Sequence, residues 1–539
     1  MTTLTLFAER LAQPFLLSWG LRRAGLCFLL GVIAAFSMPP FGLFPLLMLV
    51  FPALVWVLDG TRVAAQGDTR KKALGFFAVG WWFSFGFFLV GLSWIGEAFL
   101  VEADVYAWMM PFAVVILPAG LALFSAFSLS LASFVWGAGP NRVVALAVAL
   151  TLSDFVRAHA FTGFPWNSWG YAVAQNDSLI QLAAYLGLFG LSFLVVLVAS
   201  APAALLNGKK EGRSLPLLTV CLLLVIGATS LGFWRLNTTE LELDSVDIVI
   251  IQPNIPQSEK WKPENRNRLL PGYLSQTRDA LADREAGANP TLVFWPESAF
   301  PFLLTQEPGA LAAIADIIPQ NTYLVTGGIR SGYQGEGNPV FYNSVYLIDN
   351  EGIISDVYDK VRLVPFGEYL PLRTVLQSIG VDRLVPAPSD FTPGFRYRSM
   401  DIPGIGPFQP LVCYEAIFPQ TRLEIAERPQ FIANITNDGW FGESFGPYQH
   451  LIQARMRAVE QGIPVIRAAN TGISAVISPL GDILSQVALN STGSIEDRLP
   501  KLLRPTLYAK WGDWISVLFI LGCVCLLLVF GALLPARRD

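Results

Sequence analysis

Long apolar segments with almost no charge dominate the two ends of this 539-residue chain. Residues 73–135 contain only three charged side chains, Glu97, Glu102 and Asp104, and the segments 215–234 and 514–534 contain none. A helix needs about 20 apolar residues to cross the hydrocarbon of a bilayer, and the last two segments reach that length. Charged residues make up 14% of the chain, against about 25% in an ordinary soluble domain. The chain is therefore predicted to be an integral membrane protein.

Eight membrane spans are predicted from the positions of the apolar segments. They lie near residues 24–38, 43–58, 73–95, 107–135, 143–157, 179–206, 215–234 and 512–534. Between the seventh and the eighth span, the chain is charged, rich in turn-forming residues and of soluble character. We therefore expect a membrane domain of about seven helices at 1–239, a soluble domain at 240–508, and a last helix with a short tail at 509–539.

The distribution of Lys and Arg between the spans predicts the orientation. With a cytoplasmic N-terminus, the outer loops near 39–42, 96–106 and 158–178 hold no Lys or Arg. The inner segments then hold basic clusters such as Arg70-Lys71-Lys72 and Lys209-Lys210. Since cytoplasmic loops are enriched in Lys and Arg, we expect both termini in the cytoplasm and the soluble domain outside it.

Short apolar runs in the soluble domain indicate buried strands. They are residues 246–251, 292–295, 323–326, 345–348, 411–414 and 431–435. Helical segments lie between some of them, for example 266–284 and 448–461. Strands that alternate with helices indicate a layered α/β domain, so the predicted fold is a multi-span α-helical membrane domain joined to an α/β domain.

Composition and motif content exclude several classes of partner. The net charge of -4 argues against nucleic acid, which normally needs a basic face. The glycine-rich stretch near 327–337 lacks the Gly-Lys-Ser/Thr of a phosphate-binding loop. The chain has no HExxH motif and no Cys/His pair at zinc spacing, so neither a metal nor a cofactor is expected.

Cys413 is the one cysteine of five that falls in the soluble domain. A cysteine without a partner is either a small buried hydrophobic residue or a nucleophile. A nucleophilic thiol needs a base, because little thiolate exists at neutral pH. The chain has only two histidines, and His159 lies in the membrane part. His450 could pair with Cys413, but no papain-like signature surrounds Cys413. Carboxylates and lysines at strand ends are therefore the other candidates for the base.

Two charged residues follow predicted strands or turns in the same domain. Glu297 ends the segment TLVFWPES, where Pro296 cannot donate to a central strand ladder and should stop the strand. Lys360 lies in YDKVRLVPFGEY. Taken alone, each charge fits a solvated loop, and only the set of motifs carries a functional prediction.

The motifs around Glu297, Lys360 and Cys413 resemble the Glu–Lys–Cys motifs of the nitrilase superfamily of carbon–nitrogen hydrolases, and they come in that order. They are WPES, DKVRLVPFGEY and LVCYEAIFP. The apolar flanks narrow the resemblance to the apolipoprotein N-acyltransferase family, whose plan is several spans, an extracytoplasmic nitrilase-like domain and a last span. QPNIPQSEKW, NDGWF and RAANTGISAVISPLG are similar to further motifs of that family.

The resemblance implies an αββα sandwich and a ping-pong reaction in the bacterial inner membrane, with the catalytic domain on the periplasmic side. A membrane phospholipid would give an acyl chain to Cys413 as a thioester. The thioester would then acylate the α-amine of an S-diacylglyceryl-cysteine at the N-terminus of an apolipoprotein. Glu297 is expected to be the general base, and Lys360 is expected to stabilise the oxyanion together with the backbone N–H of Tyr414.

Several further residues of these motifs are predicted to support the reaction. Glu368 matches a second carboxylate of the family and is expected to orient Lys360, although it could simply cap a turn. Glu415 lies two positions after Cys413, so on a strand it would point to the same side. The predicted substrate contacts are Trp261, Phe366, Tyr369, Glu415 and Trp440. The alternative for Trp261 and Trp440 is a purely structural place in the core.

Two other functions are compatible with part of the pattern. The chain could be a membrane-tethered amidase that hydrolyses a small amide with water. It could also be a non-catalytic membrane scaffold with a degenerate nitrilase-like domain. The large membrane part argues against the first, because a small substrate does not need to enter from a bilayer. The presence of all three motif residues argues against the second.

Overall fold

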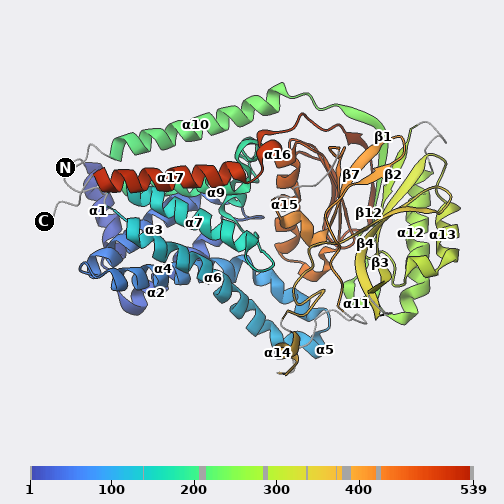
Figure 1. Ribbon diagram of the computed structural model, residues 1–539, viewed down its shortest axis with the longest axis horizontal. Coiled ribbons are helices and arrows are strands. Elements are labelled where there is room, and N and C mark those ends of the chain that lie inside the picture. Colours follow the sequence, from blue (N-terminus) through green and yellow to red (C-terminus); the bar gives the residue numbers. More distant parts are fainter. Residues whose placement is uncertain are drawn as a thin grey trace. The chain divides into compact units, whose positions relative to one another are not determined.

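The computed structural model describes residues 3–137, 139–205, 214–282, 289–334, 338–371, 373–378, 390–419 and 427–533. The chain forms two compact units. Unit 1 contains residues 1–93, 111–238 and 507–539, and unit 2 contains residues 94–110 and 239–506. Both termini belong to unit 1, which is helical, whereas the two β-sheets belong to unit 2 (Figure 1).

Unit 1 is built from helices that follow the apolar segments of the sequence. Its helices are α1 (Thr3–Leu16), α2 (Gly20–Ala35), α3 (Leu47–Ala64), α4 (Thr69–Gly91), α6 (Met110–Val135), α7 (Asn141–His159), α8 (Asp177–Ile180), α9 (Ala183–Ser200), α10 (Ser214–Thr238), α16 (Leu507–Trp511) and α17 (Trp514–Leu533).

Five helices in the described part of the chain are long and apolar enough to cross a membrane. They are Phe44–Ala64, Thr69–Gly91, Ala103–Val135, Ala183–Leu205 and Leu217–Thr238. The bent pair Arg10–Leu16 and Gly20–Ala35 would raise the number to six if it forms one span. The predicted spans at 143–157 and 512–534 coincide with α7 and α17, which do not enter that count. The eight-span topology therefore stays a prediction.

The charged residues of α7 explain why this helix is less apolar than its neighbours. Arg142 is buried and pairs with Asp59 of α3, while Arg157 donates to Asp154 at 2.8 Å within α7 itself. Ionisable side chains at membrane depth are costly unless they pair. Pairing therefore lets α7 pack inside unit 1 despite its charges.

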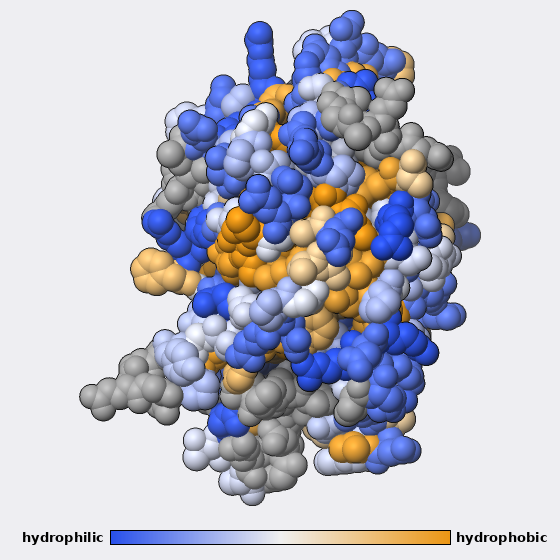
Figure 2. Space-filling model, turned by 90° about the vertical axis from the view of Figure 1, so that its right-hand side faces the viewer, coloured by the Kyte–Doolittle hydropathy of each residue, from blue (hydrophilic) through white to orange (hydrophobic). Residues whose placement is uncertain are grey.

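The outward-facing side chains of unit 1 differ from those of unit 2. Large apolar side chains on α6 and α10 are exposed, among them Phe127, Leu131, Leu223 and Phe233. A soluble protein rarely exposes so many along one helix, whereas a lipid environment favours them. On the side of unit 2 that Figure 2 presents, hydrophilic residues surround one hydrophobic area, as expected for a domain in contact with water.

Unit 2 contains two six-stranded sheets. The strands of the first are, in spatial order, β12 (Gly493–Pro500), β1 (Leu243–Gln252), β2 (Thr291–Phe294), β3 (Thr322–Gln334), β4 (Asn338–Ile348) and β5 (Ile354–Asp359). The strands of the second are β11 (Ile483–Val487), β10 (Ser474–Ile477), β9 (Val465–Ala469), β8 (Ile432–Thr436), β7 (Gly406–Val412) and β6 (Met400–Ile402). Each sheet has a parallel centre, β1–β2–β3 or β7–β8–β9.

Three separate apolar clusters hold the layers of unit 2 together. One lies between the two sheets and contains residues of both, such as Phe294 and Phe431. The second joins the first sheet to α12 (Arg266–Leu281) and α13 (Pro308–Ala315), and the third joins the second sheet to α15 (Gly446–Gln461). Figure 1 shows these helices on the outer faces of the sheets. The predicted αββα sandwich is confirmed.

The sequence located the strands of the first sheet better than those of the second, in which β6, β9, β10 and β11 were not predicted. Five of the six predicted strands overlap β1, β2, β3, β4 and β8 along their buried runs. The prediction for 411–414 is wrong at its end, because β7 stops at Val412 and Cys413 begins the 3-10 turn η9 (Cys413–Ile417). The shorter helices α5 (Ala103–Tyr106), α11 (Gln257–Lys260) and α14 (Arg373–Ser378) complete unit 2.

Candidate active site

Strand direction brings Glu297 and Lys360 to the same edge of the first sheet. β2 runs parallel to β3, and β5 follows β3 by two antiparallel steps, so β2 and β5 end at one edge. Glu297 comes three residues after β2, and Lys360 directly follows β5. Lys360 Nζ lies 3.5 Å from Glu297 Oε1. Both side chains are buried, at 7% and 1% exposure.

Glu368 is the second carboxylate that binds Lys360. Its Oε1 lies 3.0 Å from Lys360 Nζ, and its Oε2 accepts a hydrogen bond from the backbone N–H of Val364 at 2.7 Å. The turn that carries Glu368 is closed by the N–H of Phe366, which donates to the carbonyl of Tyr369 at 2.8 Å. Lys360 is thus held between two carboxylates.

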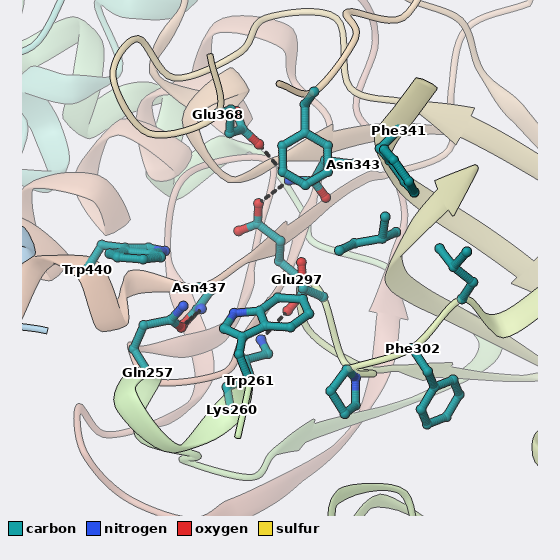
Figure 3. Close-up of a pocket in the computed structure, with 15 residues that line it drawn as sticks. Gln257, Lys260, Trp261, Glu297, Phe302, Phe341, Asn343, Glu368, Asn437 and Trp440 are labelled. Carbon is teal, nitrogen blue, oxygen red and sulfur yellow. Dashed lines mark hydrogen bonds between the residues drawn. The ribbon is translucent and has the colours of Figure 1, made fainter. Parts of the chain in front are cut away.

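Asn343 of β4 connects the two carboxylates. Its Nδ2 donates to Glu297 Oε1 and to Glu368 Oε1, both at 2.7 Å (Figure 3). Hydrogen bonds to charged acceptors are stronger than neutral ones, so this amide fixes the spacing between the carboxylates. The sequence analysis missed Asn343, and its one available signal was a polar residue inside the apolar run of β4.

Cys413 stands at the start of the turn that ends β7. Its φ of +48° is in the left-handed region, which is uncommon for a residue other than glycine. Strained backbone of this kind often occurs at functional sites. The residue is 7% exposed. The charges of Glu297, Lys360 and Asp438 all act on its thiol, and the Thr436 hydroxyl lies within hydrogen-bonding distance of it.

A buried network of His450, Asp438 and Arg467 contacts the main chain of the turn that begins at Cys413. His450 Nε2 lies 3.1 Å from the main-chain oxygen of Cys413, and its Nδ1 lies 2.8 Å from Asp438 Oδ1. Arg467 donates to Asp438 Oδ2 at 2.6 Å. Burial, and after it the charge of Arg467, lowers the pKa of His450. His450 is thereby engaged in holding the turn, which favours Glu297 over His450 as the base.

Glu415 has a structural position that strand geometry did not predict. It lies in η9, is fully buried, and accepts hydrogen bonds from the backbone N–H groups of Val361, Arg362 and Val412 at 2.8, 3.1 and 2.9 Å. It therefore ties the segment after Lys360 to the end of β7. The expectation that Glu415 points as a strand neighbour of Cys413 is wrong, because η9 is not a strand.

Burial and nearby charge set the protonation of the central groups. Burial, assisted by Glu297, raises the pKa of the Cys413 thiol, which Lys360 lowers only in part. Burial alone would lower the pKa of Lys360, but Glu368 and Glu297 together raise it well above its ordinary value. These effects favour a charged ammonium at Lys360 and a protonated thiol at Cys413.

A cavity of about 480 Å³ opens beside Glu297 and Glu368. Its wall combines aromatic side chains such as Trp261, Phe302, Phe341 and Trp440 with polar ones such as Gln257, Asn343 and Asn437 (Figure 3). The lining residues are Gln257, Lys260, Trp261, Glu297, Ser298, Pro301, Phe302, Leu303, Ile329, Phe341, Asn343, Glu368, Phe391, Asn437 and Trp440.

The cavity includes some of the predicted substrate contacts and leaves out others. Trp261 and Trp440 line it, whereas Phe366, Tyr369 and Glu415 do not. Phe366 is 44% exposed on the turn before Glu368, with φ at +65°. Cys413, Lys360 and Tyr414 are also outside the lining set, although Lys360 contacts both lining carboxylates. The described residues contain no group of three His, Cys, Asp or Glu side chains that could hold a metal ion.

Two family models match the chain in succession. The first, described as the N-terminal domain of apolipoprotein N-acyltransferase, matches residues 30–201. The second, described as carbon–nitrogen hydrolase, matches residues 253–506. The second match covers every strand of the two sheets except β1 and contains Glu297, Lys360 and Cys413.

Curated relatives match over almost the whole chain. A protein of Rhodopseudomonas palustris named apolipoprotein N-acyltransferase is 42% identical over 515 residues, which cover 94% of each chain. A protein of Bradyrhizobium diazoefficiens with the same name is 40% identical over 511 residues and also covers 94% of each. Among solved structures, an amidase from Nesterenkonia sp. matches 50% of this chain and 94% of that chain, with a TM-score of 0.35 and 20% identity.

Proposed function

Because the chain belongs to the apolipoprotein N-acyltransferase family, we propose that it transfers an acyl chain from a membrane phospholipid to the N-terminal amine of diacylglyceryl-modified apolipoproteins. One observation carries the proposal. Lys360 sits 3.0 and 3.5 Å from the buried carboxylates of Glu368 and Glu297, and the charges of Glu297 and Lys360 act on the thiol of Cys413 at the end of β7. A base, a fixed cation and a thiol are the parts that an acyl-thioester reaction needs.

In the first half-reaction, the sulfur of Cys413 attacks the carbonyl carbon of the phospholipid ester. Glu297 takes the thiol proton as the new S–C bond forms. The tetrahedral intermediate then expels the glycerol oxygen, which leaves with the proton that Glu297 returns. The products are an acyl-Cys413 thioester and a lysophospholipid, so atoms and charge balance.

In the second half-reaction, the α-amine of the diacylglyceryl-cysteine attacks the thioester carbonyl. Glu297 removes a proton from the nitrogen, the C–S bond breaks, and the thiolate of Cys413 recovers a proton. The product is an amide, which is more stable than the thioester. The reaction therefore runs toward N-acylation without an external energy source.

Both intermediates carry negative charge on the former carbonyl oxygen. Lys360 is the group proposed to stabilise it, with the backbone N–H of Tyr414 as the second donor. Loss of one such donor typically costs about 3–4 kcal/mol. Glu368 and Glu297 raise the pKa of Lys360 and so favour its charged form, which supports this role.

The membrane part suits substrates that carry acyl chains. Five or six helices of suitable length and composition fit an enzyme whose donor and acceptor both carry acyl chains. We propose that Trp261 and Trp440 in the cavity wall contact an acyl chain, with Phe366 and Tyr369 near the entrance. We further propose the bacterial inner membrane as location, the 240–508 domain on the periplasmic side, and both termini in the cytoplasm.

The test is acyl transfer by the purified protein in detergent. The protein is incubated with phospholipid and a synthetic diacylglyceryl peptide, and peptide and protein masses are recorded. We expect N-acyl peptide, and, without peptide, a mass increase of one acyl chain that hydroxylamine removes and that Cys413→Ala lacks. Release of free fatty acid with no N-acyl peptide would instead indicate a hydrolase and overturn the proposal.

A further inference from the structure

Lys260 is a second buried ammonium in this site, and the mechanism above does not use it. It ends α11, its exposure is 0%, and its side chain lines the cavity. Its Nζ donates a hydrogen bond to the main-chain oxygen of Glu297 at 2.9 Å (Figure 3). A fully buried ammonium is costly, so its presence beside the proposed base calls for a compensating role.

The charge balance of the site indicates what that role is. Three buried carboxylates, Glu297, Glu368 and Glu415, lie around Lys360, and each raises its pKa. Lys360 is the one cation among these four groups, and the carboxylates of Glu297 and Glu368 already outnumber it before a thiolate forms. Lys260 supplies a second positive charge close to Glu297.

Cys413 and Lys260 share one charged neighbour, Glu297. Cys413 feels the charges of Glu297, Lys360 and Asp438. Lys260 feels those of Glu297 and Cys413. Burial lowers the pKa of Lys260 to about 8, against the raising effect of Glu297 and Cys413. The charge that Lys260 offers the thiol is therefore present at neutral pH and is lost in alkaline solution.

The backbone around Glu297 is strained and closely packed, and Lys260 provides a hydrogen bond to it. Ser298 has a φ of +49°, a strained value for a residue with a side chain. On the opposite side, a Cβ at Gly327 would lie 2.6 Å from Glu297 Cα, so the neighbouring strand approaches as closely as glycine allows. The Glu297 carbonyl is thus turned toward Lys260, which satisfies it.

We infer that Lys260 is a positioning residue of the acyl-transfer site, which fixes the main chain of Glu297 and stabilises the thiolate form of Cys413. The positive charge of Lys260 stabilises the thiolate of Cys413 electrostatically, and its hydrogen bond holds the main-chain carbonyl of Glu297. This inference rests on the proposed nucleophile, but it concerns thiol reactivity and does not require acyl transfer to be measured.

The test is the pH dependence of Cys413 alkylation by iodoacetamide, read by peptide mass spectrometry between pH 6 and pH 10. The variant is Lys260→Met, which keeps most of the side-chain volume. The matched control is Lys262→Met, because Lys262 lies two residues away, is exposed, and pairs with Glu259 at 2.6 Å on the surface. Thermal unfolding in the same detergent checks that each variant is folded.

We expect Lys260→Met to alkylate roughly tenfold more slowly than the wild type at each pH below 8, because loss of a nearby cation raises a thiol pKa by about one pH unit or more. Lys262→Met should follow the wild-type profile. A folded Lys260→Met variant whose profile superimposes on that of the wild type would overturn the inference.

A second variant decides the matter if Lys260→Met does not fold. Lys260→Arg keeps the positive charge above pH 8, where the wild-type lysine loses it, so Cys413 should alkylate faster than in the wild type between pH 8 and pH 10. A profile equal to that of the wild type would count against Lys260. Absence of any Cys413 alkylation in the wild type would count against the proposed nucleophile instead, so the two failures are distinguishable.

Discussion

Removal of the Lys360 charge should lower both the free energy of unfolding and the rate of acyl-enzyme formation, and a second substitution can distinguish the two effects. At an effective dielectric constant of about 20, a unit charge pair at the observed 3.0 Å interacts by about 5–6 kcal/mol. Part of that is offset by the cost of burying the charges. Breaking a buried pair by removing one partner typically costs about 3–5 kcal/mol, because the remaining charge stays buried without compensation.

In Lys360→Met, Glu297 and Glu368 remain as two buried carboxylates joined by Asn343 and without their cation. We expect the free energy of unfolding to fall by about 3–5 kcal/mol. Acyl-enzyme formation should fall by roughly a hundred- to a thousandfold, because an oxyanion donor is lost. Denaturant unfolding in detergent and intact-mass kinetics of thioester formation measure the two quantities.

The double variant Lys360→Met/Glu368→Gln separates the two effects. Glutamine keeps one acceptor oxygen, for either the N–H of Val364 or the amide of Asn343, and removes one of the two uncompensated charges. We expect it to recover at least half of the lost stability and none of the lost acylation. If the double variant were no more stable than Lys360→Met, the electrostatic account of this cluster would be refuted, and rapid acylation in Lys360→Met would remove Lys360 from the mechanism.

Three further predictions follow from the same geometry. Since burial raises the pKa of Cys413, its alkylation rate should rise steadily from pH 6 to pH 8, and a rate already constant below pH 6 would contradict a protonated resting thiol. Burial raises the pKa of Glu415 from 4.5 to about 7, so the folded state binds the extra proton and stability should fall by up to about 3 kcal/mol as the pH rises from 4.5 to 7. Glu415→Gln should flatten that dependence in denaturant unfolding at several pH values, and an unchanged slope would disprove the assignment. Trp440→Leu should raise the KM for phospholipid severalfold, while hydroxylamine discharges its acyl-enzyme at the wild-type rate. An unchanged KM would exclude Trp440 as a lipid contact.

The membrane segments and the central strands were accessible from sequence because both are marked by local hydrophobicity. The runs 246–251 and 292–295 are apolar on both faces, as expected for parallel strands between two layers, and they became β1 and β2. The edge strands β5, β6, β11 and β12 were missed, because their burial pattern is mixed and resembles that of loops. The interior strands β9 and β10 were missed as well, although both are fully buried.

The candidate site was predictable only where the sequence carries a motif. Glu297 was expected at the end of a strand, and it does follow β2. Asn343 and Lys260 were not singled out, although Asn343 interrupts an apolar run and Lys260 lies in the motif QPNIPQSEKW, because neither signal indicates contact with Glu297. Glu415 was misjudged for a related reason, because the change from β7 to a turn at Cys413 depends on contacts with distant segments.

The order of amino acids alone determined that this chain enters a membrane and that it carries a glutamate, a lysine and a cysteine in one soluble domain. Hydrophobic length and motif order are properties of short stretches and need no folded context. The tertiary structure alone decided that Lys360 lies between two carboxylates, that Asn343 donates to both, and that Lys260 donates to the main chain of Glu297. These distances depend on how strands far apart in the chain align at one sheet edge, and strand alignment is a property of the packed sandwich.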